Sequence, residues 1–299
     1  MQSMKKTVAA LLAVAMMVPF AACAGGSATA SSEAASSAAA SSAAESSAAV
    51  SSEAASGSAD AVVIPDNIKS SGKIVMSTNA EFPPFESKDN NQIVGIDVDI
   101  ANAIAKKLNA QLSINDVDFD SLIMELKSNK CDFVAAGMTV TDDRKENVDF
   151  SDPYFDATQS IIVPKGSSIK SRTDLNGKTV GVQQGTTGDT FCTNEDGSSD
   201  IKVKGVQRFN KGADAITDLL NGKLDAVVID DFPAQKFVSM HSDKLQKLSD
   251  ALTVEHYAIA VKKGNTQLLN DVNIVLKELK SSGQLNTIIQ KYKSTLENG

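Results

Sequence analysis

The sequence predicts an α/β protein of two lobes, and three features of the chain indicate this fold class. From residue 73 onward, apolar strand patterns alternate with amphipathic helix patterns, which is typical of a mostly parallel sheet covered by helices. The alternation occurs in two successive series. The chain then adds one more strand and two helices, so we expect it to return to the first lobe. Two crossings, near 155–158 and near 253–257, would form a hinge.

The first series of elements runs from residue 73 to residue 137. Val98, Ala101 and Leu108 lie on one stripe at helical spacing, which predicts a helix whose apolar face is buried. Short apolar runs on either side predict strands. The predicted strands are 73–78, 93–97, 111–114 and 131–137, and the predicted helices are 98–109 and 119–129.

The second series repeats a unit of the first. The stretch 126–134 ends in KCDFV and the stretch 219–227 ends in KLDAV, at the same distance from a preceding leucine. This shared helix–turn–strand unit favours two lobes of similar architecture, although two such units can also resemble each other by chance. The predicted strands are 179–184, 201–206, 224–230 and 258–263, and the predicted helices are 212–221, 266–283 and 284–295.

The N-terminal region predicts an export signal and a tether. Two lysines precede an apolar run at 8–20 that is short for a membrane span. Cys23 follows two alanines, which resembles a bacterial lipobox, although Phe20 stands where a leucine is usual; an ordinary secretory signal is the alternative. The stretch 24–60 is nearly all Ala, Ser and Gly. We expect a signal peptide at 1–22, and a lipidated cysteine and tether at 23–60, on a Gram-positive cell surface.

Composition excludes several kinds of partner and site. The formal charge of −8 argues against nucleic acid, which normally binds basic surfaces. Two histidines and three cysteines show none of the usual zinc spacings, so we expect no metal and no cofactor. Cys131 and Cys192 could form a disulfide in an exported protein, but we expect free thiols in different lobes. We expect a monomer, with lobe 1 at 61–156 plus 257–299 and lobe 2 at 157–256.

Candidate site residues follow the carboxyl ends of four predicted strands, where open α/β sheets bind their ligands. Together they offer one strong cation, carboxylates, hydroxyls, free backbone and an aromatic ring. A ligand with both a carboxylate and an ammonium group would suit this set, in a cleft between hinged lobes. The candidates are Asn79, Glu81, Phe82, Gly137, Met138, Thr139, Arg144, Gly185, Thr186, Thr187, Asp230 and Asp231.

Five motifs follow one another from about residue 70 to the C-terminus: NAEFPPFES, GIDVDIANAIA, MTVTDDRKENVDFSDPYF, VGVQQGTT and LDAVVIDD. In sequence and order they resemble the bacterial extracellular solute-binding proteins of family 3, the polar amino-acid receptors of ABC importers. The resemblance implies a two-lobed periplasmic-binding-protein-like fold of type II, an amino-acid ligand bound by hinge closure, and an ABC permease as partner.

The resemblance also implies a role for each candidate residue. Arg144 would hold the ligand α-carboxylate through its guanidinium fork, and Asp230 would pair with the α-ammonium. The remaining roles are hydroxyl or backbone donors to the carboxylate at Thr139 and Thr187, a carbonyl acceptor at Gly137, apolar contacts on the two sides of the ligand side chain at Phe82 and Phe119, and positions that vary with ligand choice at Asn79, Glu81 and Ala136.

Each of these roles has an ordinary structural alternative. Arg144 could be a solvated surface charge, Phe82 a core residue, and the Thr186–Thr187 pair a plain helix N-cap. Asp231 rather than Asp230 could point inward. Since two phenylalanines would flank the side chain with a glutamate nearby, we expect a basic or polar amino acid.

Two other functions remain as alternatives. Cyclohexadienyl dehydratases share the fold, but no set of nucleophile, histidine and acid is evident in the sequence, so we expect a binding protein and not an enzyme. The ligand domain of a receptor or sensor kinase would require a second membrane segment or a kinase domain, and the sequence contains neither.

Overall fold

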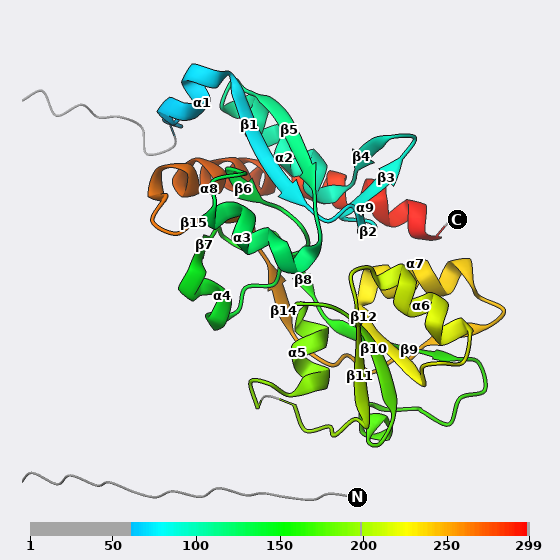
Figure 1. Cartoon of the computed structure of the whole chain (residues 1–299). Helices are drawn as coiled ribbons and strands as arrows, with labels where there is room; N and C mark the ends of the chain where they lie inside the picture. Colours follow the sequence, from blue (N-terminus) through cyan, green and yellow to red (C-terminus); the bar gives the residue numbers. More distant parts are fainter. Residues whose placement is uncertain (1–60, 198, 298–299) are drawn as a thin grey trace, which may run out of the picture. The chain divides into compact units, whose positions relative to one another are not determined.

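Two five-stranded sheets form the framework of the protein (Figure 1). The computed structural model describes residues 61–197 and 199–297. The expected signal peptide, Cys23 and tether at 1–60 lie outside these residues. Within the described residues, no helix combines the length and the apolar character that crossing a membrane requires.

The first sheet has the strand order β5-β1-β6-β15-β7. β1 runs parallel to β5 and β6, whereas β15 runs antiparallel to β6 and β7. The late strand therefore lies inside the first sheet, which confirms the predicted return of the chain. The bounds are β1 (Lys73–Thr78), β5 (Gln111–Asp116), β6 (Phe133–Val134), β7 (Val148–Phe150) and β15 (Ala260–Lys262).

The second sheet has the strand order β11-β10-β12-β9-β13. β10 is parallel to β11 and β12, and β9 is antiparallel to β12 and β13. Two long strand patterns at 179–184 and 224–230 are confirmed, while the strand expected at 201–206 lies further along the chain. The bounds are β9 (Gln159–Pro164), β10 (Thr179–Gln183), β11 (Gly205–Phe209), β12 (Ala226–Asp230) and β13 (Leu245–Lys247).

Two short strands connect the sheets. β8 (Phe155–Ala157) leads from the first sheet to the second, and β14 (Glu255–Tyr257) leads back. They pair antiparallel, with His256 opposite Asp156. Both crossings were predicted at these positions, and the lobe boundaries at 156/157 and 256/257 stay a prediction.

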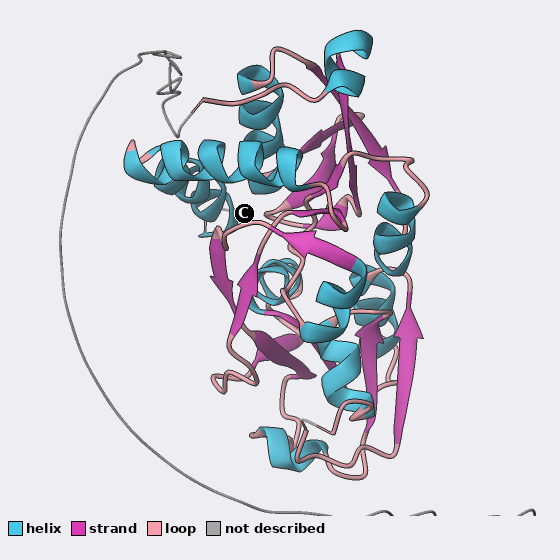
Figure 2. Ribbon diagram, turned by 90° about the vertical axis from the view of Figure 1, so that its left-hand side faces the viewer, coloured by secondary structure: helices cyan, strands magenta, loops and turns pink. Residues whose placement is uncertain are grey.

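Helices cover the faces of both sheets (Figure 2), and the second sheet shows why. All five residues of β12 are buried, because alternate side chains enter opposite cores. Val227 and Ile229 pack in one hydrophobic cluster, and Ala226 and Val228 in the other. The helices are α1 (Asp66–Ser71), α2 (Ile96–Lys107), α3 (Leu122–Lys127), α4 (Asp142–Asn147), α5 (Thr187–Thr193), α6 (Gly212–Leu220), α7 (Asp231–Met240), α8 (Thr266–Ser281) and α9 (Gln284–Glu297), with single 3-10 turns at η1 (Phe119–Ser121) and η2 (Arg172–Leu175).

The strand expected at 93–97 is wrong in part. A small sheet of β2 (Glu81–Phe82), β3 (Glu86–Asp89) and β4 (Gln92–Val94) occupies this region, and α2 begins directly after it at Ile96. The reason is Gly95, whose φ of 148° ends the strand and whose hydrogen atom faces the Phe85 carbonyl, where a Cβ would lie 2.0 Å away.

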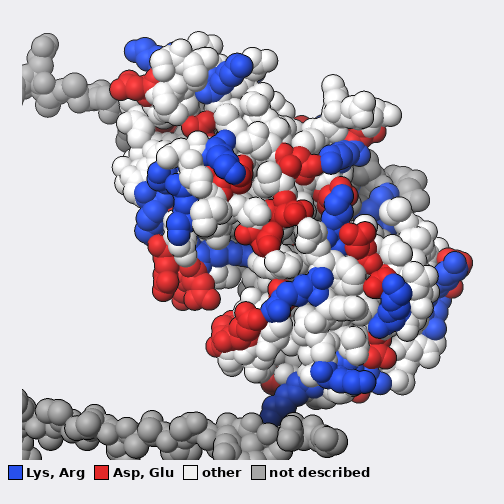
Figure 3. Space-filling model, viewed as in Figure 1, with Lys and Arg blue, Asp and Glu red and all other residues white. Residues whose placement is uncertain are grey.

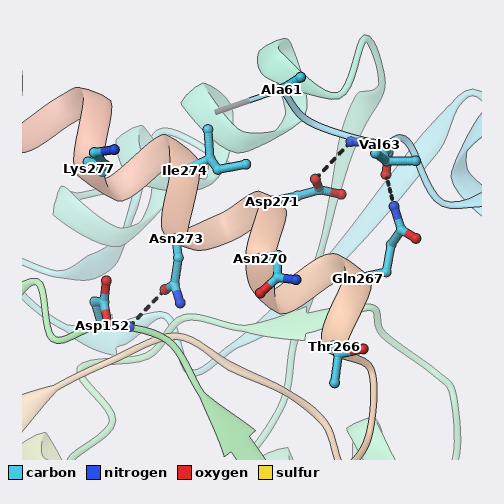
Figure 4. A pocket seen from close by; sticks show the side chains of 10 residues that line it. All are labelled: Ala61, Val63, Asp152, Thr266, Gln267, Asn270, Asp271, Asn273, Ile274 and Lys277. Carbon is cyan, nitrogen blue, oxygen red and sulfur yellow. Dashed lines mark hydrogen bonds between the residues drawn. The ribbon is translucent and has the colours of Figure 1, made fainter. Parts of the chain in front are cut away.

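The first described residues are tied to α8 (Figure 4). Asp271, which is buried, accepts a hydrogen bond from Val63 N at 2.9 Å, and Gln267 donates to the Val63 carbonyl. Asn273 accepts from Asp152 N at 2.8 Å at the other end of the same hollow, which has a volume of about 530 Å³. These contacts fix where the chain enters the fold, and none of the hollow's lining residues is a candidate site residue.

Candidate functional site

Nine residues from both sheets surround one small closed space. Gly137, Thr139 and Arg144 come from the segment after β6, and the others follow the ends of strands in the two sheets. The sequence placed candidates at these strand ends, and the structure brings most of them together. The lining residues are Phe82, Phe119, Gly137, Thr139, Arg144, Gln183, Thr186, Thr187 and Asp230.

Arg144 reaches across the site from α4. Thr141 caps this helix by accepting from Arg144 N at 3.2 Å. The guanidinium donates to the Thr139 carbonyl at 2.7 Å and to the Gly185 carbonyl at 2.9 Å, and it lies 5.4 Å from the Phe119 ring centre. Loss of water lowers the pKa of Arg144 from its ordinary value, although Glu255 and Asp230 oppose this. Within 61–197 and 199–297 the guanidinium has no ion pair, so an anionic ligand group would satisfy its charge.

Asp230 is the inward carboxylate of the DD pair. It is buried at the end of β12 and accepts a hydrogen bond from the Tyr257 hydroxyl. Burial, and then the charge of Glu255, raise the pKa of Asp230 to about 7. Asp231 instead pairs with Lys247 and accepts from Ser160 Oγ at 2.7 Å outside the cavity. The alternative assignment to Asp231 therefore does not fit the geometry.

Glu255 is a site residue that the sequence analysis missed. Its buried carboxylate accepts from Thr139 Oγ1 at 2.6 Å and from Thr187 Oγ1 at 2.9 Å. Thr139 lies 116 positions away in the sequence, and no local pattern marks a lone glutamate in VEHY. The only available signal was its place at the second predicted crossing.

Gly137 lets the Phe82 ring approach the backbone. Its φ of 52° is left-handed, and a Cβ there would lie 2.7 Å from Phe82 Cε1. Its N–H donates to the buried carboxylate of Asp97 at 2.8 Å. Phe82 is only 6% exposed and also packs on Phe85, with ring centres 5.9 Å apart. Phe82 is thus both a core residue and one wall of the cavity.

The threonine pair after β10 divides its functions. Thr186 is the N-cap of α5, since its hydroxyl accepts from Asp189 N at 3.2 Å and donates to the Gln183 carbonyl at 2.8 Å. The plain N-cap alternative therefore describes the Thr186 side chain. Thr187 instead directs its hydroxyl to Glu255.

Asn79 and Glu81 lie beside the cavity and not in its wall. Both line an adjoining hollow that also contains Asp116, Asp118 and Lys211. Glu81 Oε1 pairs with Lys211 Nζ at 2.8 Å. Asn79 Oδ1 accepts from Gln183 Nε2 at 2.9 Å, and since Gln183 lines the cavity, this hydrogen bond separates the two spaces.

Ala136 and Met138 are placed differently from expectation. Both are 1% exposed and pack in a hydrophobic cluster with Leu122 and Val134. In the strand period their side chains point away from Gly137 and Thr139, so they support the site from behind. Cys131 lies in the same cluster and Cys192 in another, and both are free, as expected.

Charge is mixed over the visible face of the protein. Figure 3 shows acidic and basic side chains interspersed on the face seen in Figure 1, with no continuous basic area there. Across the described residues, no group of three or more His, Cys, Asp or Glu side chains is arranged to hold a metal ion. The chemistry on offer is therefore that of charged and hydrogen-bonding groups around a small closed space.

Comparison with known proteins gives one family and consistent relatives. The family model for bacterial extracellular solute-binding proteins, family 3, matches residues 74–295. The chain is 39% identical to a probable histidine-binding protein of Neisseria gonorrhoeae, over 74% of this chain and 83% of that one. It is 36% identical to the arginine-binding extracellular protein ArtP of Bacillus subtilis, over 74% of this chain and 86% of that one.

A solved structure agrees with these relatives. The arginine-bound form of truncated ArgBP from T. maritima has a TM-score of 0.67 and 48% identity to this chain, over 72% of this chain and 100% of that one. All three of these similar proteins are described as binding proteins, and none as an enzyme.

Proposed function

The chain belongs to the bacterial extracellular solute-binding proteins, family 3, and from this premise we propose that it binds a basic amino acid, arginine by preference, for an ABC importer. The single observation that carries the proposal is the closed space in which Arg144 from one sheet faces Asp230 from the other. A free amino acid presents a carboxylate and an ammonium a few ångströms apart. One fixed cation and one fixed anion across a small cavity suit that pair.

The contacts of Arg144 support its role as the α-carboxylate ligand. Its guanidinium is held by two carbonyl groups and lacks a counter-ion among the described side chains. Asp230 supports the role of ammonium ligand, because burial holds its pKa near 7 and a neighbouring cation would favour its charged form. Phe82 and Phe119 would flank the ligand side chain.

The charge balance around the cavity supports a cationic side chain. Arg144 contributes one positive charge, and Asp230 and Glu255 contribute up to two negative charges. An amino acid with a cationic side chain carries one net positive charge, which would neutralise the site. Beyond the Asn79–Gln183 hydrogen bond, the hollow that contains Glu81, Asp116 and Asp118 could receive the distal cation. The named relatives, which bind arginine or histidine, point the same way.

We further propose that Cys23 anchors the protein to the outer face of the cell membrane through lipid, with 24–60 as a tether and the folded part acting as a monomer beside its permease. The short apolar run and small residues before Cys23 support this anchor. Replacing Cys23 by Ser should move the protein from the membrane fraction into the medium or leave it uncleaved. Unchanged lipid labelling of the variant would contradict the anchor.

The enzyme alternative is set aside. The relatives are substrate-binding proteins, and the charged groups of the cavity are fully used by ligand binding. The chain therefore delivers a solute and does not transform it.

A thermal-shift screen tests the ligand. Ligand-stripped protein is heated with each proteinogenic amino acid in turn, because a ligand that binds only the folded state raises the melting temperature. We expect the largest rise with arginine, smaller rises with lysine, histidine and glutamine, and none with glutamate. At micromolar affinity, about −8 kcal/mol, calorimetry can then measure the best ligands directly. A largest rise with an acidic or aliphatic amino acid would contradict the proposal.

A further inference from the structure

Glu255 joins groups from the two sheets on one oxygen atom. Thr139 follows β6 of the first sheet, and Thr187 begins α5 beside the second. Their hydroxyls both donate to Glu255 Oε2, at 2.6 Å and 2.9 Å. Glu255 itself stands on β14, one of the two strands that connect the sheets. The two threonines expected to hold the ligand are therefore held, in turn, by one buried carboxylate.

The direction of this carboxylate is fixed by further donors. Thr253 Oγ1 donates to the other oxygen, Oε1, at 2.8 Å. Gln159 Nε2 donates to Thr187 Oγ1 at 3.1 Å and lies 3.5 Å from Glu255 Oε2. A buried carboxylate is tolerated only where such donors replace its water. Glu255 is thus a rigid acceptor, and its partners are constrained with it.

This arrangement decides where the hydroxyl hydrogens point. A threonine hydroxyl has one hydrogen, and an ionised carboxylate can only accept. Thr139 and Thr187 therefore donate to Glu255 and present only oxygen lone pairs elsewhere. Lone pairs attract an ammonium group and repel a carboxylate. The hydroxyls cannot be the donors that hold the ligand carboxylate, which leaves Arg144 and backbone N–H groups for that task.

We propose that Glu255 is a positioning residue of the amino-acid site, which orients both threonine hydroxyls as acceptors and so fixes which end of the ligand enters on which side. The inference rests on the proposed function of the same cavity. It acts through Thr139 and Thr187, so its effect on binding requires their hydroxyl groups.

Calorimetric titration with arginine tests this inference. Glu255→Gln keeps the size of the side chain but removes the charge and adds a donor that opposes the two hydroxyls. We expect it to weaken arginine binding by about 10- to 100-fold. Glu278→Gln, an exposed glutamate on α8 that pairs with Lys107, is the matched control and should bind like the wild type. Equal affinities of the two variants would overturn the inference.

The coupling between residues separates positioning from a general structural role. In a protein that already carries Thr139→Val and Thr187→Val, Glu255→Gln should cost less than about threefold, because the groups through which it acts are gone. A full additional loss in that background would overturn the inference.

A second series keeps the test decisive if Glu255→Gln does not fold. Thr139→Ser should bind arginine within about threefold of the wild type, and Thr139→Val should lose about tenfold. Equal binding by both would overturn the inference. Wild-type protein that binds no amino acid would overturn the proposed function itself, whereas wild-type binding with insensitive variants would overturn the inference alone.

Discussion

At the scale of single residues, the site consists of charges whose partners are incomplete. Arg144 is held by carbonyl groups, and Asp230 by the Tyr257 hydroxyl. Neither arrangement neutralises the charge of its group. Because burial raises the cost of such a charge, each group binds an opposite charge more strongly than a solvated residue would.

The first prediction concerns Arg144. Arg144→Ala should raise the dissociation constant for every amino acid tested by about 30-fold or more, because losing a buried charged partner costs about 2–5 kcal/mol. The matched control is Arg172→Ala, since Arg172 is exposed and pairs with Asp200 far along the second half of the chain. Calorimetry on both variants measures the effect. Retained binding by Arg144→Ala would exclude it as the carboxylate ligand.

The second prediction concerns pH. The pKa of Asp230 is raised to about 7 without ligand, and a bound ammonium would lower it. Below pH 7, binding must therefore release a proton, so arginine affinity should weaken as pH falls, by up to about tenfold per pH unit. Titrations between about pH 8 and about pH 5.5, in buffers of different ionisation enthalpy, measure the proton release. Asp230→Asn should bind weakly and with a flatter pH profile, and a flat wild-type profile would contradict the assignment.

At the scale of elements, the sequence predicted long apolar patterns well and short polar ones poorly. β1 and β10 match their expected ranges closely, because buried strands leave unbroken apolar runs. α4 was missed because its six residues, DDRKEN, are all polar and include no buried residue. That short helix positions Arg144, so the residue was found through family resemblance and its element was not.

The limits of the sequence also follow from distance along the chain. Glu255 and Gln183 act through partners 116 and 104 positions away, and no local pattern contains such pairs. Ala136 and Met138 were placed in the site because they neighbour Gly137, whereas the strand period turns their side chains to the core.

The third prediction tests the turn that leaves β6. Gly137→Ala meets two costs: a left-handed φ and a contact of 2.7 Å with the Phe82 ring. Gly166→Ala is the matched control, since its φ of 81° is also left-handed but nothing lies within 4 Å of the added Cβ. We expect about 1–2 kcal/mol of destabilisation at Gly166, and about 1–3 kcal/mol more at Gly137 together with lost arginine binding. Denaturant titration and calorimetry measure both, and equal effects would contradict the close packing of Phe82.

At the scale of the whole molecule, closure depends on polar contacts between the sheets that surround the cavity. Gln184 Nε2 donates to Asp120 Oδ2 at 2.6 Å, and Asn210 Nδ2 to Asp118 Oδ2 at 3.0 Å. Gly185 permits this approach, since a Cβ there would lie 3.0 Å from Asp120 Cβ. Each contact is partly exposed and weak. A closed state held by weak contacts can reopen, which a protein that delivers its ligand requires.

The Glu81–Lys211 ion pair combines closure with ligand choice. Lys211 Nζ contacts Glu81 Oε1 at 2.8 Å, and Glu81 raises the pKa of Lys211. Glu81 is the candidate acceptor for a cationic ligand side chain, so the lysine and the ligand would compete for one carboxylate. Both side chains are partly exposed, so the pair itself contributes only about 0–1 kcal/mol to closure.

The fourth prediction follows from this competition. Lys211→Met should weaken glutamine binding slightly, by about fivefold at most, because only the weak closing contact is lost. Arginine should lose less or gain, since Glu81 becomes free to accept its guanidinium, so the preference for arginine over glutamine should rise by about 2- to 10-fold. Glu81→Gln should lower that preference, and adding Lys211→Met to it should change nothing further. Calorimetry with both ligands on the three variants measures these ratios. If Lys211→Met weakened arginine and glutamine equally, the ion pair would act only in closure, and the choice of ligand charge would have to come from the cavity around Asp230 and Glu255.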